Sequence, residues 1–225
     1  MTSKYKSKLE TREAAEHRAL MDRAEQLPGG REDLLAEARK AIDRLNEAVM
    51  AGDAPGVADA FRTYDAVVWR LNGDTFFASR DCWNPEAGGH VVDRHCAATP
   101  GQEPLWGQKG EFLISVQGMR ARVEIKEGFG PQHVSIHFHA VDVHRPFISE
   151  TGFLSAFDNV RLGKSPREAV EAIFQEKMSK RPIYLTPSAV RSCSSNPVPD
   201  WLERKLGDFA CAPVEDAAGQ LGLGF

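Results

Sequence analysis

The segment from His133 to His144 concentrates imidazole side chains, because it holds four of the chain's seven histidines. Its residues alternate with the period of a β-strand, in which successive side chains point to opposite faces. The apolar members share one face and can pack on a core: Val134, Ile136, Phe138 and Ala140. The polar members share the other face: His133, Ser135, His137 and His139. Three imidazoles on one strip can bind a metal, bind an anion or respond to pH.

His137 and His139 are the predicted metal ligands of this strip. A His-x-His pair on a strand places the two residues about 7 Å apart at the backbone, and their side chains can close onto one ion. Another element must supply a carboxylate, and we assign this role to Glu150; further possible donors are Glu124, Asp142 and His144. Zinc or another divalent ion held there would support a hydrolase or a nuclease. The alternative is a solvated sheet face that uses histidine without a cofactor, and we favour it because motifs without structural context are weak.

A second group of metal-ligand residue types lies between Cys82 and Cys96, with His90, Asp93 and His95 between them. Two thiolates and two imidazoles can form a structural zinc site, and zinc would fix the shape of a long loop. Their spacing matches none of the usual closed-site patterns, and the adjacent His95 and Cys96 cannot easily face one ion. We therefore expect a small buried cysteine with exposed histidines, and leave open whether the four converge.

Other candidate binding residues are basic or aromatic. Arg120 and Arg122 share a predicted strand and can contact phosphates beside His133. Trp106 and Phe147 lie in predicted loops, where aromatic side chains either fill the core or anchor a protein contact. No helix-turn-helix, RNA-recognition, phosphate-loop or dinucleotide-binding signature accompanies them, and no catalytic signature is complete. We therefore expect a protein that is not an enzyme, with catalytic residues unknown.

Composition restricts the class of protein. The chain of 225 residues is 42% hydrophobic and 27% charged, which is ordinary for a globular protein. Its net charge of -4 indicates no global attraction to nucleic acid or anionic lipid, although a local basic patch is compatible with it. No secretory signal is visible, and no apolar run approaches the roughly 20 residues that span a bilayer. The four cysteines are widely spaced, which favours free thiols and a cytoplasmic location without membrane insertion.

Hydrophobic periodicity and turn residues predict an α+β fold. Helical patterns cover about 6–26, 31–51 and 53–73, and the last two can form a hairpin. Residues 74–110 are irregular and either contain short strands or are functional. A three-stranded antiparallel meander follows over about 111–143, and a capped helix at 166–180 covers its apolar face. The predicted domains are an N-terminal helical segment (1–52), an α+β domain (53–210) and a flexible C-terminal tail (211–225).

Three blocks of sequence resemble accessory proteins of broad-host-range conjugative plasmids. They are VVWRLNGDTFF at 67–77, PLWGQKGEF at 104–112 and RPFISETGF at 145–153, and the likeness covers roughly residues 60–180. The resemblance implies a small cytoplasmic protein that manages plasmid maintenance, resists host defence or inhibits the transfer of a competing plasmid. It supplies no catalytic motif.

These observations favour a plasmid accessory protein that acts through protein contacts. Fertility inhibition of a competing conjugative plasmid, or anti-defence, is the leading function, with a component of the transfer apparatus or of host defence as partner. The metal-dependent hydrolase or nuclease on the His133–His139 strand is one alternative. A DNA-binding plasmid regulator is the other, although the net charge does not indicate nucleic acid as a partner.

Overall fold

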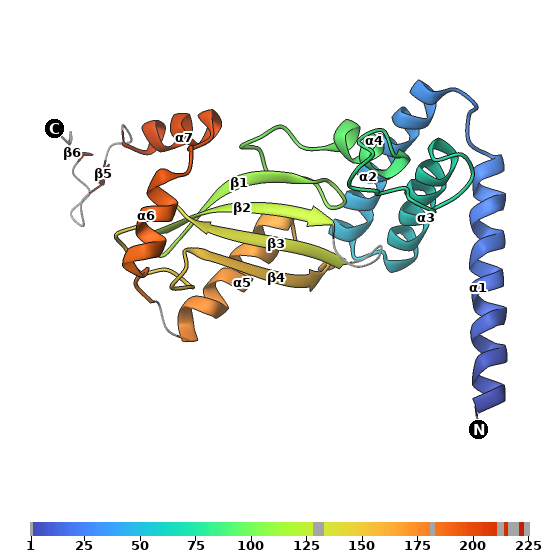
Figure 1. Ribbon diagram of the computed structural model, residues 1–225, viewed down its shortest axis with the longest axis horizontal. Coiled ribbons are helices and arrows are strands. Elements are labelled where there is room, and N and C mark those ends of the chain that lie inside the picture. The colour runs from blue at the N-terminus through green and yellow to red at the C-terminus, as the bar shows by residue number, and fades with distance from the viewer. Residues whose placement is uncertain (1, 128–132, 181–182, 211–213, 216–220, 223–225) are drawn as a thin grey trace.

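The chain forms an antiparallel sheet with helices at both ends and on one face (Figure 1). The computed structural model describes residues 2–127, 133–180, 183–210, 214–215 and 221–222. Over these residues the predicted α+β class is confirmed, as are the N-terminal helical hairpin, the meander and the covering helix.

Helices form the N-terminal part of the chain: α1 (Thr2–Glu25), α2 (Arg31–Ala51), α3 (Ala54–Leu71) and α4 (Gly88–Cys96). Gly52 ends α2 with a φ of 72°, and the Asp53 side chain caps α3 by accepting from the Gly56 amide at 3.1 Å. Buried residues join α2, α3 and α4 in one cluster: Leu34, Ala38, Ile42, Val67, Val68, Val92 and Cys96. In Figure 1, α1 lies at the outer edge of this layer and its N-terminal part extends past the other helices. No helix among the described residues is both long enough and apolar enough to cross a bilayer.

Helix α4 occupies part of the region where the sequence suggested short strands. Its two leading glycines are required by close backbone packing. A Cβ atom on Gly88 would lie 2.8 Å from the Cβ of Asn72, and one on Gly89 would lie 2.6 Å from the carbonyl oxygen of Ser79. The pair therefore lets α4 approach the end of α3 and the loop that follows it.

The sheet has four strands in the order β1 (Gly110–Val116), β2 (Met119–Glu127), β3 (His133–Ala140) and β4 (Phe153–Asn159), all antiparallel to their neighbours. The meander was predicted with three strands, and β4 adds a fourth at the edge beside β3. Gln117 and Gly118, with φ values of 52° and 75°, form the tight turn between β1 and β2.

Helix α5 (Pro166–Lys180) covers one face of the sheet, as predicted. Its first turn is a capping box: the Ser165 amide donates to Glu168 Oε2 at 2.8 Å, and the Glu168 amide donates to Ser165 Oγ at 3.3 Å. Phe174 packs on Phe138 of β3 with ring centroids 5.5 Å apart. The main core therefore lies between α5 and the inward face of β1–β4.

Two further helices, α6 (Pro187–Ser195) and α7 (Asp200–Ala210), follow α5. Trp201 and Leu202 of α7 pack on Leu113, which points to the face of the sheet away from α5. Of the predicted flexible tail at 211–225, the structure describes only Val214–Glu215 (β5) and Leu221–Gly222 (β6), which pair with each other. The rest of the tail lies outside the described residues. The predicted domain boundary at residue 52 stays a prediction, and α2 and α3 pack on each other across it.

Candidate functional site

The pairing of β2 with β3 sets charged residues opposite the histidines. Arg122 lies opposite His139, Glu124 opposite His137, and Lys126 opposite Ser135. All of them belong to the face of the sheet away from α5, because their neighbours Val123, Ile125, Ile136 and Phe138 are buried in the main core. The structure thus confirms the predicted alternation of β3, with apolar residues on one face and His137 and His139 on the other.

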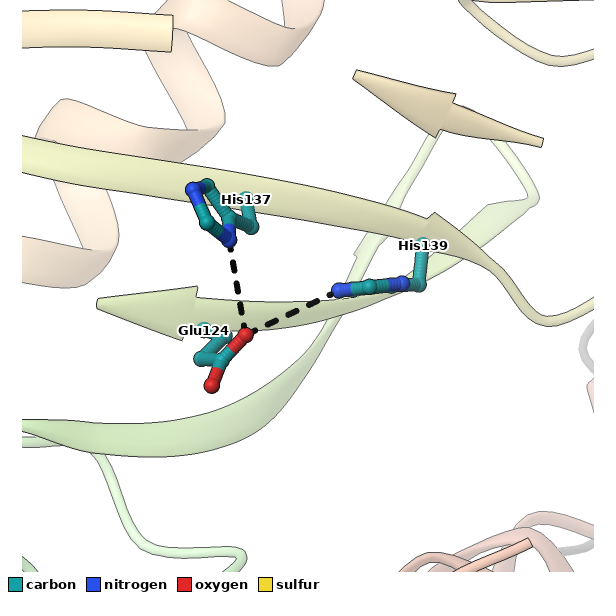
Figure 2. A group of neighbouring side chains, drawn as sticks. All are labelled: Glu124, His137 and His139. Atoms are coloured by element: carbon teal, nitrogen blue, oxygen red, sulfur yellow. Dashed lines mark ion pairs between the residues drawn. The ribbon is translucent and has the colours of Figure 1, made fainter. Parts of the chain in front are cut away.

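Glu124, His137 and His139 form a compact group on this face, as Figure 2 shows. Glu124 Oε2 lies 3.5 Å from His137 Nδ1 and 3.8 Å from His139 Nε2, and one ligand atom from each residue lies within 4.8 Å of the others. The two predicted histidines therefore come together with a carboxylate. That carboxylate is Glu124 and not Glu150, which is exposed in the loop before β4 and whose carbonyl oxygen accepts from the Thr186 amide.

Neighbouring side chains hold the two imidazoles in place. Ser135 Oγ lies 3.2 Å from the other ring nitrogen of His137, within hydrogen-bonding distance. Phe153 of β4 contacts both rings, with centroids 5.4 Å from His137 and 5.1 Å from His139. The Nε2 atom of His139 is buried and makes no hydrogen bond within the described part of the chain. Phe153 was not predicted as part of the group, because its strand β4 was not predicted.

Charges around the group favour a carboxylate beside neutral imidazole. Burial raises the pKa of Glu124. The hydrogen bond from Lys126 at 3.0 Å and the nearby positive charges together outweigh this effect, so the pKa of Glu124 lies below its ordinary value. The pKa of His139 is also lowered, first by burial and then by the positive charge of Arg122. At neutral pH the His139 ring is therefore neutral, the form that can donate a lone pair to a metal.

Of the other predicted binding residues, both arginines are paired with carboxylates. Arg120 pairs with both carboxylate oxygens of Asp142. Arg122 donates to Glu111 at 2.9 Å, and Trp201 of α7 donates to the same carboxylate at 2.6 Å. His133 is exposed at the start of β3.

The two predicted aromatic anchors are core residues. Trp106 and Phe147 are each 2% exposed, and Trp106 Nε1 donates to the Lys164 carbonyl oxygen at 2.7 Å. Of the two roles that the sequence left open for them, filling the core is therefore the observed one. They cannot serve as surface anchors in this structure.

The residues from Cys82 to Cys96 do not form a three-ligand group among the described residues. Cys82 is exposed, whereas Cys96 is buried at the end of α4, and burial raises the pKa of its thiol to about 11. His90 Nε2 lies 3.2 Å from the Asp81 carbonyl oxygen, and His95 is exposed. The buried Cys96 and the exposed His95 agree with the arrangement that the sequence favoured, whereas His90 is half-buried.

Asp93 of α4, which the sequence suggested only as a member of a possible metal group, is the centre of a buried polar cluster that was not predicted. Its carboxylate accepts from the Tyr64 hydroxyl at 2.9 Å and from Lys109 Nζ at 2.7 Å, and Arg80 lies 3.6 Å away. Burial and the charge of Asp93 raise the pKa of Tyr64, so its hydroxyl stays protonated and donates. The cluster ties α3 and α4 to the segment that leads into β1.

Three arginines gather where α2 meets α4. Arg31 and Arg94, with side chains 60% and 54% exposed, both pair with Glu86, at 3.4 Å and 2.8 Å. Arg39 donates to the Cys96 carbonyl oxygen at the end of α4 at 3.3 Å. We call Arg31, Arg39 and Arg94 the arginine surface. The loop between α3 and α4 adds two exposed aromatic side chains, Phe77 at 86% and Trp83 at 90%.

Comparison with known proteins finds two family models that each match part of the chain. Residues 19–95 match the family model described as the KlcB N-terminal DNA-binding domain, and residues 109–201 match the one described as the KlcB third domain. The chain is similar to KlcB. It is 42% identical to one Escherichia coli protein KlcB over 182 residues, which are 79% of this chain and 44% of that protein. It is 41% identical to a second Escherichia coli protein KlcB over 178 residues, which are 78% of this chain and 38% of that protein.

The chain thus spans less than half the length of the KlcB proteins that it matches. KlcB is a plasmid-associated protein, and the similarity supports the plasmid setting that the sequence resemblance implied. The arginine surface and Asp93 lie in the segment similar to the KlcB DNA-binding domain. Glu124, His137 and His139 lie in the segment similar to the KlcB third domain. No solved structure matches the fold.

Proposed function

We propose that the chain is a DNA-binding accessory protein of a plasmid and that the arginine surface contacts DNA. The observation that carries the proposal is the match of residues 19–95 to the KlcB N-terminal DNA-binding domain. This is the plasmid-regulator alternative predicted from the sequence, which the net charge and the lack of a nucleic-acid-binding signature had placed last.

The arginine surface supports this assignment because its cations come from two helices and remain largely exposed. Arginine guanidinium groups bind phosphate oxygens through paired N–H donors, and such contacts supply most of the affinity for DNA. Glu86 lies between Arg31 and Arg94, so DNA must compete with one carboxylate for two cations. This competition is a reason to expect modest, salt-sensitive affinity.

The charge of the whole segment restricts the mode of binding. Residues 19–95 contain nine Arg and Lys but fourteen Asp and Glu, so no diffuse positive field surrounds the helices. Contacts must therefore be local and few, and removing a few arginines should abolish most of the binding.

Fluorescence anisotropy with a labelled DNA duplex tests the proposal. We expect an Arg31→Gln/Arg39→Gln/Arg94→Gln variant to bind at least tenfold more weakly than the natural chain at low salt. The slope of log affinity against log salt should become shallower by about 0.9 for each phosphate that the variant no longer neutralises. Circular dichroism checks that the variant is folded, since Arg39 also bonds the end of α4.

The matched control removes the same number of positive charges from exposed sites outside residues 19–95: Arg191, Arg204 and Lys205. An Arg191→Gln/Arg204→Gln/Lys205→Gln variant should bind within twofold of the natural chain. Equal losses of affinity in both variants would mean that only net charge matters, which would contradict the assigned surface. Absence of DNA binding by the natural chain at low salt would overturn the function itself.

A second candidate is the protein-contact role, in fertility inhibition of a competing conjugative plasmid or in anti-defence. It is favoured by Phe77 and Trp83, because large aromatic side chains this exposed are typical anchors of protein interfaces. The partner would be a component of the transfer apparatus or of host defence. We expect the chain to lower transfer of a competing plasmid between cells, and a Phe77→Ser/Trp83→Ser variant to lose that effect while keeping DNA affinity.

The arginine variant separates the two candidates. If transfer inhibition survives in it but fails in the Phe77→Ser/Trp83→Ser variant, the effect runs through a protein partner. No change of transfer with the natural chain, in cells that express it, would remove this second role.

A further inference from the structure

We propose that Glu124, His137 and His139 bind one divalent transition-metal ion, with zinc as the expected ion. The inference concerns the segment similar to the KlcB third domain and does not depend on DNA binding. Two imidazoles and one carboxylate are a donor set used by zinc and by non-haem iron, both of which accept nitrogen and oxygen ligands.

The distances within the group fit a metal better than they fit hydrogen bonds. An imidazole that donates to a carboxylate lies about 2.7–3.2 Å from it. Glu124 Oε2 is farther from both histidine nitrogens, at 3.5 Å and 3.8 Å. Tetrahedral zinc with ligands at about 2.0–2.1 Å sets its ligand atoms about 3.3 Å apart. Because all three ligand atoms lie within 4.8 Å of one another, small side-chain rotations would bring them onto one ion.

The carboxylate is oriented for this role. One oxygen of Glu124 is hydrogen-bonded to Lys126 at 3.0 Å, and the other oxygen faces both imidazoles, as Figure 2 shows. Lys126 thereby fixes the carboxylate without occupying the oxygen that would bind the ion.

His139 supplies an independent observation. Its Nε2 atom is buried and has no hydrogen-bond partner among the described residues, which is costly for a polar atom unless something binds it. This is the nitrogen that faces Glu124. Coordination of a metal would remove the cost.

The surroundings of the histidines resemble the outer shell of a metal site. Ser135 Oγ lies 3.2 Å from the Nε2 atom of His137, on the far side of the ring from Glu124, where a partner fixes the orientation of a metal-binding imidazole. Phe153 packs against both rings and limits their rotation. Both features hold the nitrogens toward the carboxylate before any ion arrives.

Three protein ligands leave at least one coordination position open, which is the arrangement of reactive zinc sites. His139 also lines a groove between the sheet and the α6–α7 region, together with Arg122, Phe153 and Leu202. Water or an oxygen anion such as a carboxylate or a phosphate entering this groove is the class of ligand that the open position would take.

Zinc titration of the purified full chain without a histidine tag, followed by calorimetry, tests the proposal. We expect one zinc ion per chain and at least a hundredfold weaker binding in a His137→Ala/His139→Ala variant. The matched control is His133→Ala/His144→Ala, which removes two exposed histidines from the same segment and should bind zinc within twofold of the natural chain.

Two conservative variants keep the test decisive if the double alanine variant does not fold. Glu124→Gln should weaken zinc binding at least tenfold, and Ser135→Ala by about tenfold, the lower end of the loss seen when an outer partner of a metal ligand is removed. Cobalt bound in place of zinc should show visible absorption bands that Glu124→Gln changes. Absence of stoichiometric zinc binding by the natural chain, or equal loss in the His133→Ala/His144→Ala control, would overturn the site.

Discussion

Arg120 is bound to Asp142 through both carboxylate oxygens, and this pair has a consequence for pH. The hydrogen bonds from Arg120 hold the pKa of Asp142 below its usual value, more than burial raises it. In the unfolded chain the carboxyl has a pKa of about 3.9. Because the folded pKa is the lower one, the pair stabilises the fold fully above about pH 4 and loses that contribution as pH falls through the folded pKa.

Replacing Asp142 with Asn should therefore destabilise the protein at neutral pH. We expect a loss of about 1.5–3 kcal/mol at pH 7, typical of hydrogen bonds to a charged group, and a much smaller difference near pH 2. Urea unfolding of both proteins across this pH range measures it. Asp22→Asn, at an exposed position of α1, is the control and should change the free energy of unfolding by less than about 0.5 kcal/mol at pH 7. A pH-independent difference for Asp142→Asn would contradict the ion pair.

The candidate site shows how far single residues could be predicted. Strand alternation alone placed His137 and His139 on one face, because a period of two is local information. The choice between Glu124 and Glu150 depended on the register of β2 against β3, which no local pattern encodes. Trp106 was ambiguous for a similar reason: a loop residue is buried or exposed according to what packs on it.

At the scale of elements, α5 begins with a capping box that was predicted from the sequence and is present in the structure. Ser165 and Glu168 exchange hydrogen bonds across the first turn, and Pro166 occupies its first position. Replacing Ser165 with Ala leaves the Glu168 amide without its side-chain acceptor. We expect the free energy of unfolding to fall by about 1 kcal/mol, measured by thermal or urea denaturation.

The same substitution within α5 provides the control. Ser179 is exposed near the end of the helix, and its hydroxyl donates to the Glu176 carbonyl oxygen at 2.8 Å without capping free amides. Because alanine is the better helix former, Ser179→Ala should be neutral or slightly stabilising. Similar destabilisation by both substitutions would show that capping is not what stabilises the start of α5.

The elements that were missed lacked such local signals. Strand β4 alternates in exposure, but its outward positions carry Phe153 and Phe157, so the apolar–polar alternation typical of an edge strand is blurred. Helix α4 begins with two glycines, which lower helix propensity and are retained for close packing. Helices α2, α3 and α5 were predicted because each has a distinct cap or a continuous apolar stripe.

At the scale of the whole molecule, Asp93 connects the two regions that resemble different KlcB domains. Its own helix and Tyr64 belong to residues 19–95, whereas Lys109 begins the segment at 109–201. The Asp93 side chain is only 9% exposed, so its charge interacts with Lys109 with little screening by water. Replacing Lys109 with Met keeps the apolar stem but removes the cation, and leaves the buried carboxylate less compensated.

We expect Lys109→Met to lower the free energy of unfolding by about 1.5–3 kcal/mol, as is typical of a hydrogen bond to a charged group, because Asp93 keeps Tyr64 and Arg80 as partners. Lys164→Met, at an exposed position, should change it by less than about 0.5 kcal/mol. Asp93→Asn should then lower the free energy of unfolding less in the Lys109→Met variant than in the natural chain. In the variant, the substitution removes a carboxylate that has already lost its lysine partner. Urea unfolding of the four proteins of this cycle measures the coupling. Strictly additive losses of stability would mean that the two regions are joined by their apolar packing, and that the charge of Asp93 contributes nothing specific to holding them together.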